Sequence, residues 1–249
     1  MLFRSISEHV KNQNWVAVAI DFLIVVIGVF IGIQVANWNE GRASREAYLQ
    51  AIERARVEVS ENLEFIDSQA EAIDTALSGA REGFDALLDC SDEPGALEKV
   101  NAGIVEIRGT RGFQTRTEAV DELTTNPVLL AEQSDPVRER LSELRFFQRL
   151  AMDISGRFEP SITDLWPSES SAVAIQPAED FTSRWQGIEY TVPRYAVALE
   201  VGVQEACSDK ALLNWFFSWE TWQTNVLIFN KKLRAEYEDT LSMLQELQE

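Results

Sequence analysis

The two cysteines of this 249-residue chain, Cys90 and Cys207, are the side chains most able to bond covalently to each other. Cys90 lies in the breaker-rich segment 89–95, where a long periodic stretch ends, and Cys207 lies just before a second such stretch. If both stretches are helices that pack antiparallel, the two thiols meet at one end of a bundle, which predicts a disulfide. Disulfides persist outside the reducing cytoplasm. The alternative interpretation is two unrelated buried thiols in a cytoplasmic body.

Histidine, a common general base and metal ligand, occurs once in the chain, as His9. The body therefore has no histidine for a Ser-His or Cys-His nucleophile and none to ligate a metal ion. The sequence has no glycine-rich phosphate loop of the Walker or dinucleotide-binding type, and no carboxylate spacing singles out an acid and a base. We therefore predict no catalytic, cofactor-binding or metal-binding residues, no cofactor, and a protein that is not an enzyme.

Two further groups of residues have both a functional and a structural interpretation. The arginines of segment 108–116 could bind an anion, but they match no phosphate-loop pattern, so a solvated loop or intramolecular ion pairs are favoured. The tryptophans of segment 215–222 could form a ligand-stacking wall, but their stripe continues with apolar residues, which favours a buried aromatic core. The residues concerned are Arg108, Arg111 and Arg116, and Trp215, Trp219 and Trp222.

An apolar run from Trp15 to Trp38 contains a single charged residue, Asp21. As a helix with a rise of ~1.5 Å per residue it is ~36 Å long, enough to cross a hydrocarbon core of ~30 Å. The terminal Trp rings suit the two membrane interfaces. A cleaved signal peptide is the alternative, but this run exceeds a typical apolar region of ~7–15 residues and ends without a small-x-small pair. We expect a transmembrane helix at 15–38, in contact with the lipid bilayer, after a short cytoplasmic tail at 1–14.

One face of the predicted span carries small residues and the single acid: Ala17, Asp21, Gly28, Gly32 and Ala36. At ~100° per residue they fall within one sector of roughly 100°. Gly28 and Gly32 have the small-xxx-small spacing that lets two membrane helices approach closely. One interpretation is a self-association or partner face with Asp21 as its polar contact. The other is that Asp21 reaches the headgroups or is protonated and the glycines are incidental.

The net charge of −19 belongs almost entirely to the body. Residues 1–40 hold two basic and three acidic residues, which leaves −18 on residues 41–249. This charge argues against binding nucleic acid or an anionic lipid surface. Arginines after the span favour a cytoplasmic body by simple counting, but glutamates are interleaved with them and long domains translocate largely regardless of flanking charge. The predicted disulfide decides for an extracytoplasmic body.

The body, residues 39–249, contains two long stretches with apolar residues three and four apart, at about 39–89 and 209–247. This rhythm is typical of amphipathic helices with a bundle or coiled-coil seam. No proline interrupts the first stretch, so its helix can continue directly from the span. The predicted fold class is all-α: a single N-terminal transmembrane helix followed by an elongated antiparallel helical bundle.

The middle of the body, 96–200, is less regular, and we expect it to be irregular and helical. A helix is predicted to start at Asp135, which is followed by proline in the first turn. Gly156 and Pro160 are expected to close it. The segment 167–180 is predicted to be a polar loop.

The stretch VVIGVFIGIQVANWNEGR resembles the start of a domain-of-unknown-function family of bacterial single-pass inner-membrane proteins. In that family a hydrophobic run ends in Gln, then Asn-Trp-Asn-Glu, and leads into a long charged helix. The matching residues are Gly28, Gly32, Gln34, Asn37, Trp38, Asn39 and Glu40. A weaker likeness covers Ala119 to Leu150, with Leu129-Leu130 before a helix opened by Asp135-Pro136-Val137-Arg138. The family has no established activity, so the resemblance implies a bacterial membrane location and no reaction.

These observations lead to two expected functions. The first is a membrane-anchored helical domain, in the bacterial inner membrane with a periplasmic body, that acts through protein contacts as a scaffold or accessory subunit. The second is an extracytoplasmic sensor module that binds a ligand between its helices and signals through a partner, since residues 1–14 are too short for a signalling domain. In either case we expect a homo-oligomer or a membrane-protein partner, and no nucleic acid.

Overall fold

The computed structural model describes residues 15–163, 169–185 and 188–247, without the side chains of 15–18 and 183–185. Its longest element is α2, one helix of 74 residues from Trp15 to Leu88, about 110 Å long at ~1.5 Å per residue. The chain has no proline before Pro94, so nothing in this stretch removes a helical hydrogen bond. The predicted span and the first body helix are therefore one continuous element. The predicted tail with His9 lies outside the described residues.

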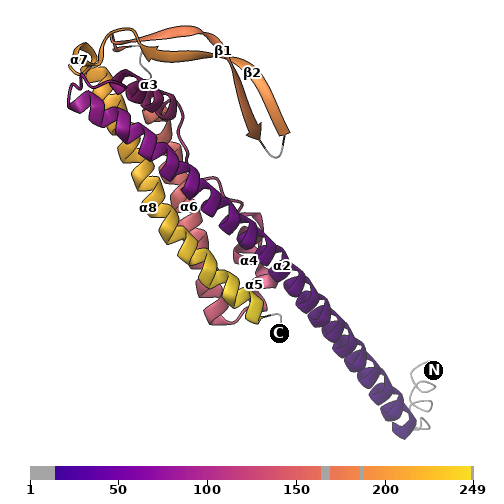
Figure 1. The fold of residues 1–249 in the computed structure, drawn as a ribbon. Helices are drawn as coiled ribbons and strands as arrows, with labels where there is room; N and C mark the ends of the chain where they lie inside the picture. Colours follow the sequence, from indigo (N-terminus) through magenta and orange to yellow (C-terminus); the bar gives the residue numbers. More distant parts are fainter. Residues whose placement is uncertain (1–14, 164–168, 186–187, 248–249) are drawn as a thin grey trace, which may run out of the picture.

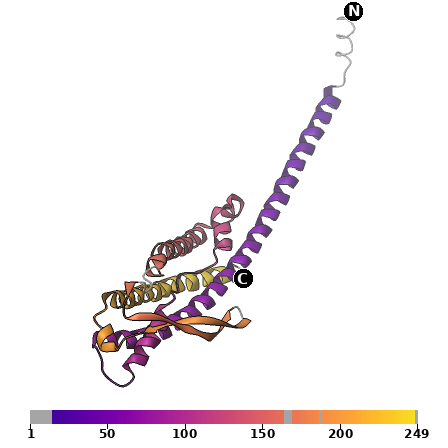
Figure 2. The same ribbon diagram turned by 90° about the horizontal axis from the view of Figure 1, so that it is seen from above.

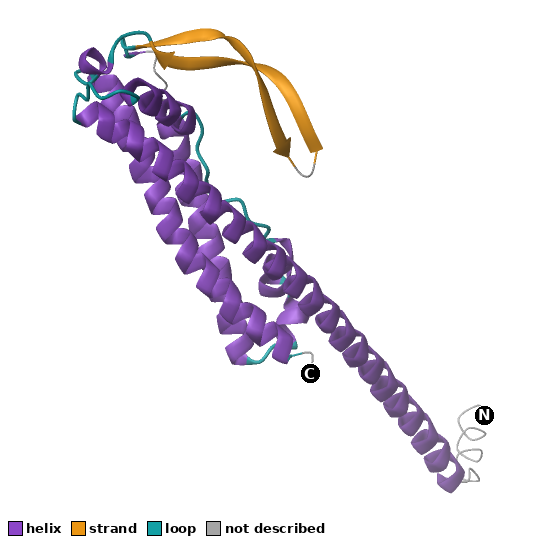
Figure 3. Ribbon diagram, in the orientation of Figure 1, coloured by secondary structure: helices purple, strands orange, loops and turns teal. Residues whose placement is uncertain are grey.

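The bundle is elongated and consists of three long helices: α2, α6 (Asp135–Thr163) and α8 (Lys210–Glu246). Each helix buries an apolar stripe, and burying one large apolar side chain contributes ~1.5–3 kcal/mol. The largest fully buried side chains include Ile52, Ile73, Leu77 and Leu87 of α2, Leu141 and Leu144 of α6, and Leu212, Phe216, Trp219 and Tyr237 of α8. The predicted all-α fold class is confirmed, and Figure 3 shows how helices dominate the molecule.

Contacts along the bundle show that α8 runs antiparallel to α2. Phe216, early in α8, stacks on Phe84, late in α2, with 5.5 Å between the ring centroids. Arg234, later in α8, donates from Nε to Asp67 Oδ1 at 2.7 Å, earlier in α2. In both views α2 continues beyond the bundle at its N-terminal side (Figures 1 and 2). The bundle is therefore carried on an extension of one of its own helices.

Four shorter helices complete the helical part: α3 (Ala96–Ile107), α4 (Glu118–Thr125), α5 (Pro127–Ala131) and α7 (Val203–Ala206). α3 packs closely on α2 at Gly83, where an added Cβ would lie 2.7 Å from the Lys99 carbonyl oxygen. Only glycine fits such an approach without a shift of backbone. The expected helical segments of the middle are thus present up to α6.

The end of α6 differs from the prediction. The helix passes through Gly156 and Pro160 and ends at Thr163. A proline inside a helix removes one hydrogen bond and crowds the carbonyl four residues earlier. Here that carbonyl belongs to Gly156, an exposed residue close to the helix end. Water can satisfy it there, so the helix continues for one more turn.

The middle also contains an element that was not predicted, a two-stranded antiparallel hairpin of β1 (Val173–Trp185) and β2 (Ile188–Leu199). The predictions of a polar loop at 167–180 and of a helical middle up to residue 200 are wrong for this part. Pro177 and Pro193 disfavour a helix, and the β-branched and aromatic residues between them favour extended backbone. Pro177 lies at the register shift between Ile175 and Ala178, where a residue without an N–H is tolerated.

The hairpin is attached to the bundle at its base. Val197 and Leu199 of β2 are buried, and Leu199 N–H donates to Asn101 Oδ1 of α3 at 2.9 Å. Figure 1 shows the rest of the ribbon leaving the end of the bundle near α3 and α7 and turning back toward the middle of α2. Most of its length is therefore available for contacts with other molecules.

Candidate functional site

The apolar part of α2 is the feature with the clearest physical role. Within the described chain, α2 is the one helix that is long and apolar enough to cross a membrane, by length and composition. None of its apolar window is buried in the structure. From Tyr48 onward the same helix buries a stripe in the bundle. A single helix therefore changes from a surface suited to lipid to one suited to protein contacts.

The predicted packing face of the span is open. Asp21, Gly28, Gly32 and Ala36 are exposed, and a Cβ added to either glycine would meet nothing within 4 Å. Ala17 lies in α2, but its side chain is outside the described residues. The structure contains one chain, so the use of this face between molecules stays a prediction.

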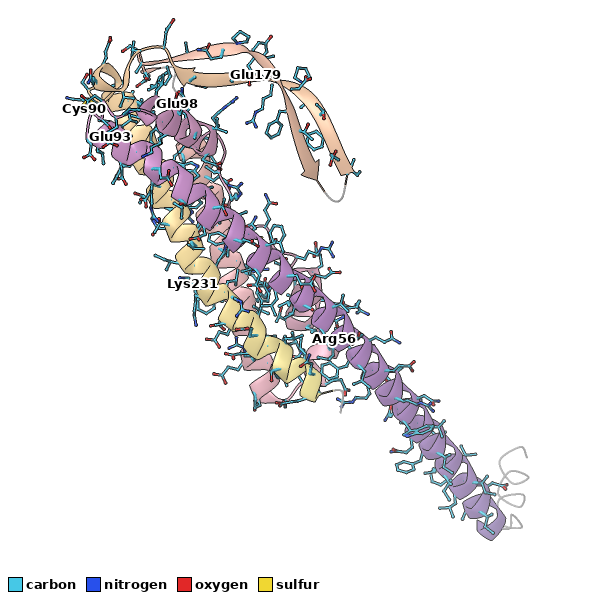
Figure 4. All side chains as sticks on the ribbon, in the orientation of Figure 1. Arg56, Cys90, Glu93, Glu98, Glu179 and Lys231 are labelled. Atoms are coloured by element: carbon cyan, nitrogen blue, oxygen red, sulfur yellow. A yellow bond between two sulfur atoms is a disulfide. The ribbon has the colours of Figure 1, made fainter. Side chains whose placement is uncertain are left out.

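The predicted disulfide pair is brought together at the end of the bundle. Cys90 and Cys207 are bonded, with their Cα atoms 5.3 Å apart, and Figure 4 places Cys90 at the end far from the exposed part of α2. Cys90 has a φ of 46° and caps α2: its N–H donates to Leu87 O, and Ser91 N–H donates to Ala86 O. Glycine usually occupies such a left-handed capping position. The cysteine stands there because its sulfur is needed for the bond to Cys207.

The arginines of segment 108–116 and the tryptophans of segment 215–222, which each had a functional and a structural interpretation, both have largely structural contacts. Arg116 pairs with Glu61, as expected for an intramolecular ion pair. Burial lowers the pKa of Arg108, and the nearby charge of Arg194 lowers it further. The predicted aromatic core is confirmed, because all three tryptophans of the stripe are buried. Trp219 Nε1 also donates to the Gly109 carbonyl oxygen at 2.7 Å, which fixes the loop after α3.

Buried polar contacts between α2 and α4 were not foreseen from the sequence. Glu58 of α2 accepts the N–H of Ala119 at 2.7 Å and that of Val120 at 3.2 Å, which caps the start of α4. Burial raises the pKa of Glu58, and the two backbone donors offset part of this rise. No local pattern marks Glu58, because its partners are about sixty residues away.

A second buried contact ties the segment before α4 to the bundle. Asn62 donates to the Arg116 carbonyl oxygen at 2.8 Å and accepts the Arg116 N–H at 2.9 Å. Nearby, Gln148 of α6 donates to the Tyr237 hydroxyl at 2.9 Å. Burial raises the pKa of Tyr237 to about 12, so its hydroxyl stays neutral. These groups hold the helices in register.

An apolar groove lies between α6 and α8, with a volume of about 340 Å³. Its lining residues come from the loop before α4, from α6 and from α8: Phe113, Ile154, Phe158, Trp222, Asn225, Val226, Ile228 and Phe229. Phe158 and Ile228 at its rim are exposed. The sequence offered one signal for it, since these two residues are large and apolar but lie outside the expected core stripes.

The hairpin has one apolar face. Cross-strand pairs alternate between faces, so the pair Phe181–Val192 shares a face with Tyr190 and Ile188, and the pair Thr182–Thr191 lies on the other face. We call Phe181, Ile188, Tyr190 and Val192 the hairpin apolar face. Their exposed fractions range from 37% to 66%. On the other face the hydroxyls of Thr182 and Thr191 lie 2.8 Å apart.

The chain matches no family model, no curated protein and no solved structure. Among residues 15–163, 169–185 and 188–247, no cluster of three or more His, Cys, Asp or Glu side chains is arranged to hold a metal ion. Three surfaces of the described chain are candidates for a function. They are the span face, which consists of Asp21, Gly28, Gly32 and Ala36, the hairpin apolar face, and the groove between α6 and α8.

Proposed function

We propose that the protein is a membrane-anchored helical domain that performs no reaction and acts through protein contacts, as a scaffold or accessory subunit. The observation that carries this proposal is the hairpin apolar face, which is exposed apart from the Arg194 guanidinium, 4.9 Å from the centroid of the Phe181 ring. A two-stranded hairpin is marginally stable in water on its own. Its open edges and one apolar face suit a protein surface that covers them.

The continuous helix α2 supports the same role. It links the apolar window near the N-terminus to the bundle without a break, so the bundle and its hairpin are held at a defined height above a membrane. A fixed height matches a partner that is in the same membrane, either a second copy of the chain or another membrane protein. The span face of Asp21, Gly28 and Gly32 offers such a partner a close helix contact.

We propose a bacterial inner membrane with a periplasmic body as the location. The disulfide between Cys90 and Cys207 supports a compartment outside the reducing cytoplasm. The likeness of the anchor to single-pass bacterial proteins of unknown function, ending in Asn37-Trp38-Asn39-Glu40, supports membership of that family. Thiol labelling of intact and then permeabilised cells tests the location. Two cysteines that react without a reductant would contradict it.

A second function is favoured by one specific observation, the apolar groove between α6 and α8. A ligand-binding groove in an extracytoplasmic bundle suits a sensor module that signals through a partner. Because α6 and α8 both pack in the bundle that α2 anchors, an occupied groove would alter helices that are coupled to the membrane anchor. This function also requires a partner, which carries the signal.

The scaffold proposal is tested by purification in mild detergent of chains that carry two different tags. Tyr190→Glu with Val192→Glu places charges on the hairpin apolar face. Thr182→Glu with Thr191→Glu is the matched control on the opposite face. A partner, either the second tagged copy or another membrane protein, should be retained by wild type and control and lost by the face variant. Equal retention by all three chains would contradict the proposal.

A further inference from the structure

The groove between α6 and α8 has the size of a small-molecule site. Its volume is about 340 Å³, within the usual range of roughly 300–1,000 Å³ for ligand pockets. An engineered apolar cavity of about 150 Å³ holds one benzene molecule. The groove is therefore large enough for a molecule of one or two rings.

The lining of the groove is aromatic and uncharged. Two ring pairs form its walls: Phe113 with Phe229, whose centroids are 5.1 Å apart, and Phe158 with Trp222, at 6.2 Å. No Lys, Arg, Asp or Glu lines it, although the chain as a whole carries a net charge of −19. A charged occupant would lose its hydration without gaining a partner, so this lining selects an uncharged molecule.

One buried donor in the wall lacks a partner. Trp222 is 6% exposed, and its Nε1 makes no hydrogen bond within the described chain. Trp219, one turn earlier, has its indole N–H bonded to the Gly109 carbonyl oxygen. Buried polar groups are usually paired, and Trp222 lines the groove, so its indole N–H suits a ligand that brings a hydrogen-bond acceptor.

The position of the groove excludes the acyl chain of a bilayer lipid as its occupant. Arg81 pairs with Glu220, and Asp67 pairs with Arg234, so the groove lies beside residues 67–81 of α2. These residues are roughly 45–65 Å along the helix from Trp38, at ~1.5 Å per residue. The occupant therefore comes from the aqueous phase.

We propose that the groove between α6 and α8 binds a dissolved, uncharged molecule of one or two rings that carries one hydrogen-bond acceptor, such as an aromatic ketone. Aromatic walls hold the rings, and the acceptor pairs with the Trp222 indole N–H after a small shift of the wall. The proposal gives the ligand class for the sensor module, the second of the proposed functions. It does not depend on the hairpin apolar face.

Benzophenone is a suitable probe, because it has two rings, one carbonyl acceptor and no charge. On irradiation its carbonyl carbon bonds to a neighbouring carbon, and the hydrogen displaced there reduces the carbonyl to a hydroxyl. The full-length protein in lipid vesicles is irradiated with increasing benzophenone, and the adducts are mapped by mass spectrometry. Adducts at 154–158 and 225–229 should saturate, whereas those at lipid-exposed residues 20–35 should rise in proportion to concentration.

Competition with two further compounds tests the hydrogen bond. Indanone, which has two rings and a carbonyl, should suppress the groove adducts about five-fold more effectively than indane, which has the same rings without a carbonyl, as expected for one net hydrogen bond. Trp222→Phe keeps a ring in the wall and removes the N–H. This variant should retain saturable adducts and lose the preference for indanone over indane.

A matched pair of variants tests the location. Ile228→Glu places a charge at the rim of the groove, and Phe217→Glu places one elsewhere on α8, at residues that are 60% and 59% exposed. Ile228→Glu should lower the groove adducts at least ten-fold, and Phe217→Glu should leave them unchanged. Far-UV circular dichroism and the retained disulfide show that both variants are folded.

Adducts in the groove that do not saturate would overturn the proposal, as would equal labelling of the Ile228→Glu and Phe217→Glu proteins. Saturable labelling with no effect of benzophenone on partner retention would support the binding site and contradict the sensor function. The scaffold function is tested separately by the hairpin variants, so each failure can be recognised.

Discussion

Cys90 and Cys207 are separated by 117 positions in the chain, yet a disulfide joins them with a Cα–Cα distance of 5.3 Å. The bond links the end of α2 to the segment between α7 and α8, at the end of the bundle where the hairpin also begins (Figure 4). Cys90 adopts a left-handed conformation there, which costs an L-residue roughly 1–2 kcal/mol. The bundle end is thus closed covalently even though the local backbone would favour glycine.

Removal of this bond should lower the stability of the bundle. For Cys90→Ser with Cys207→Ser, chain-entropy estimates for so long a loop give a loss of up to about 4–5 kcal/mol, and measured values are often smaller. Urea unfolding of the full-length protein in detergent, followed by far-UV circular dichroism, measures the loss. The neighbouring substitutions Ser91→Ala and Ser208→Ala serve as controls. An unchanged midpoint in the cysteine variant would show that packing alone closes this end.

The long helices and the disulfide could be predicted from the sequence, because both depend on regular patterns. Apolar residues three and four apart mark α2 and α8 over many turns, and the breaker segments at their ends carry the two cysteines. An antiparallel arrangement of the helices then brings the thiols together.

The hairpin and the groove could not be predicted in the same way. In the hairpin, Pro177 with its register shift interrupts the alternation of faces, so the strand pattern is short and broken. The groove depends on how α6 and α8 pack, and its residues are far apart in the sequence. The buried carboxylate of Glu58 is likewise explained only by its distant partner α4.

The span face should support close helix association. Gly28→Ile with Gly32→Ile adds bulk to a face where small residues permit close approach, so crosslinking between copies in native membranes should decrease strongly. Gly41→Ile is the control, because Gly41 lies roughly 140° around α2 from Gly28 and is equally free of neighbours. An unchanged crosslinking pattern in the double variant would leave the two glycines without a packing role.

The pKa of Glu58 gives the bundle a defined pH dependence. Burial raises this pKa above its ordinary value of 4.5, so the folded state holds the proton more tightly than the unfolded state. The stability that this provides is present below pH 4.5 and is lost as the pH rises through the folded-state pKa. Glu58→Gln does not titrate, so it should gain stability relative to wild type between pH 4.5 and neutral pH. Urea unfolding midpoints are measured across this range, with Glu61→Gln at an exposed position as the control. A constant difference between the midpoints of Glu58→Gln and wild type would refute the prediction.

Glu236 of α8 should behave in the opposite way. Burial acts to raise its pKa, but Lys232 and Arg140 outweigh burial and lower the pKa below 4.5. Its contribution to stability is therefore present above pH 4.5 and is lost as the pH falls through the folded-state pKa. Glu236→Gln should destabilise the bundle by about 1–3 kcal/mol at pH 7, and the difference should shrink in acid. Glu238→Gln, at an exposed neighbouring position, is the control and should change the stability little. A loss of stability in Glu236→Gln that is the same at every pH would argue against the ion cluster of Glu236, Lys232 and Arg140.

Site-specific photocrosslinking tests the proposed contact between the hairpin apolar face and a protein partner. A benzoyl-phenylalanine replaces either Val192, on the apolar face, or Thr191, the adjacent residue on the opposite face, in the full-length protein in intact cells. After irradiation, the chain with the probe at position 192 should form a discrete adduct of higher mass with a second copy or another membrane protein. The chain with the probe at position 191 should form at least five-fold less of this adduct. Equal adducts from the two positions, or none from Val192, would contradict the claim.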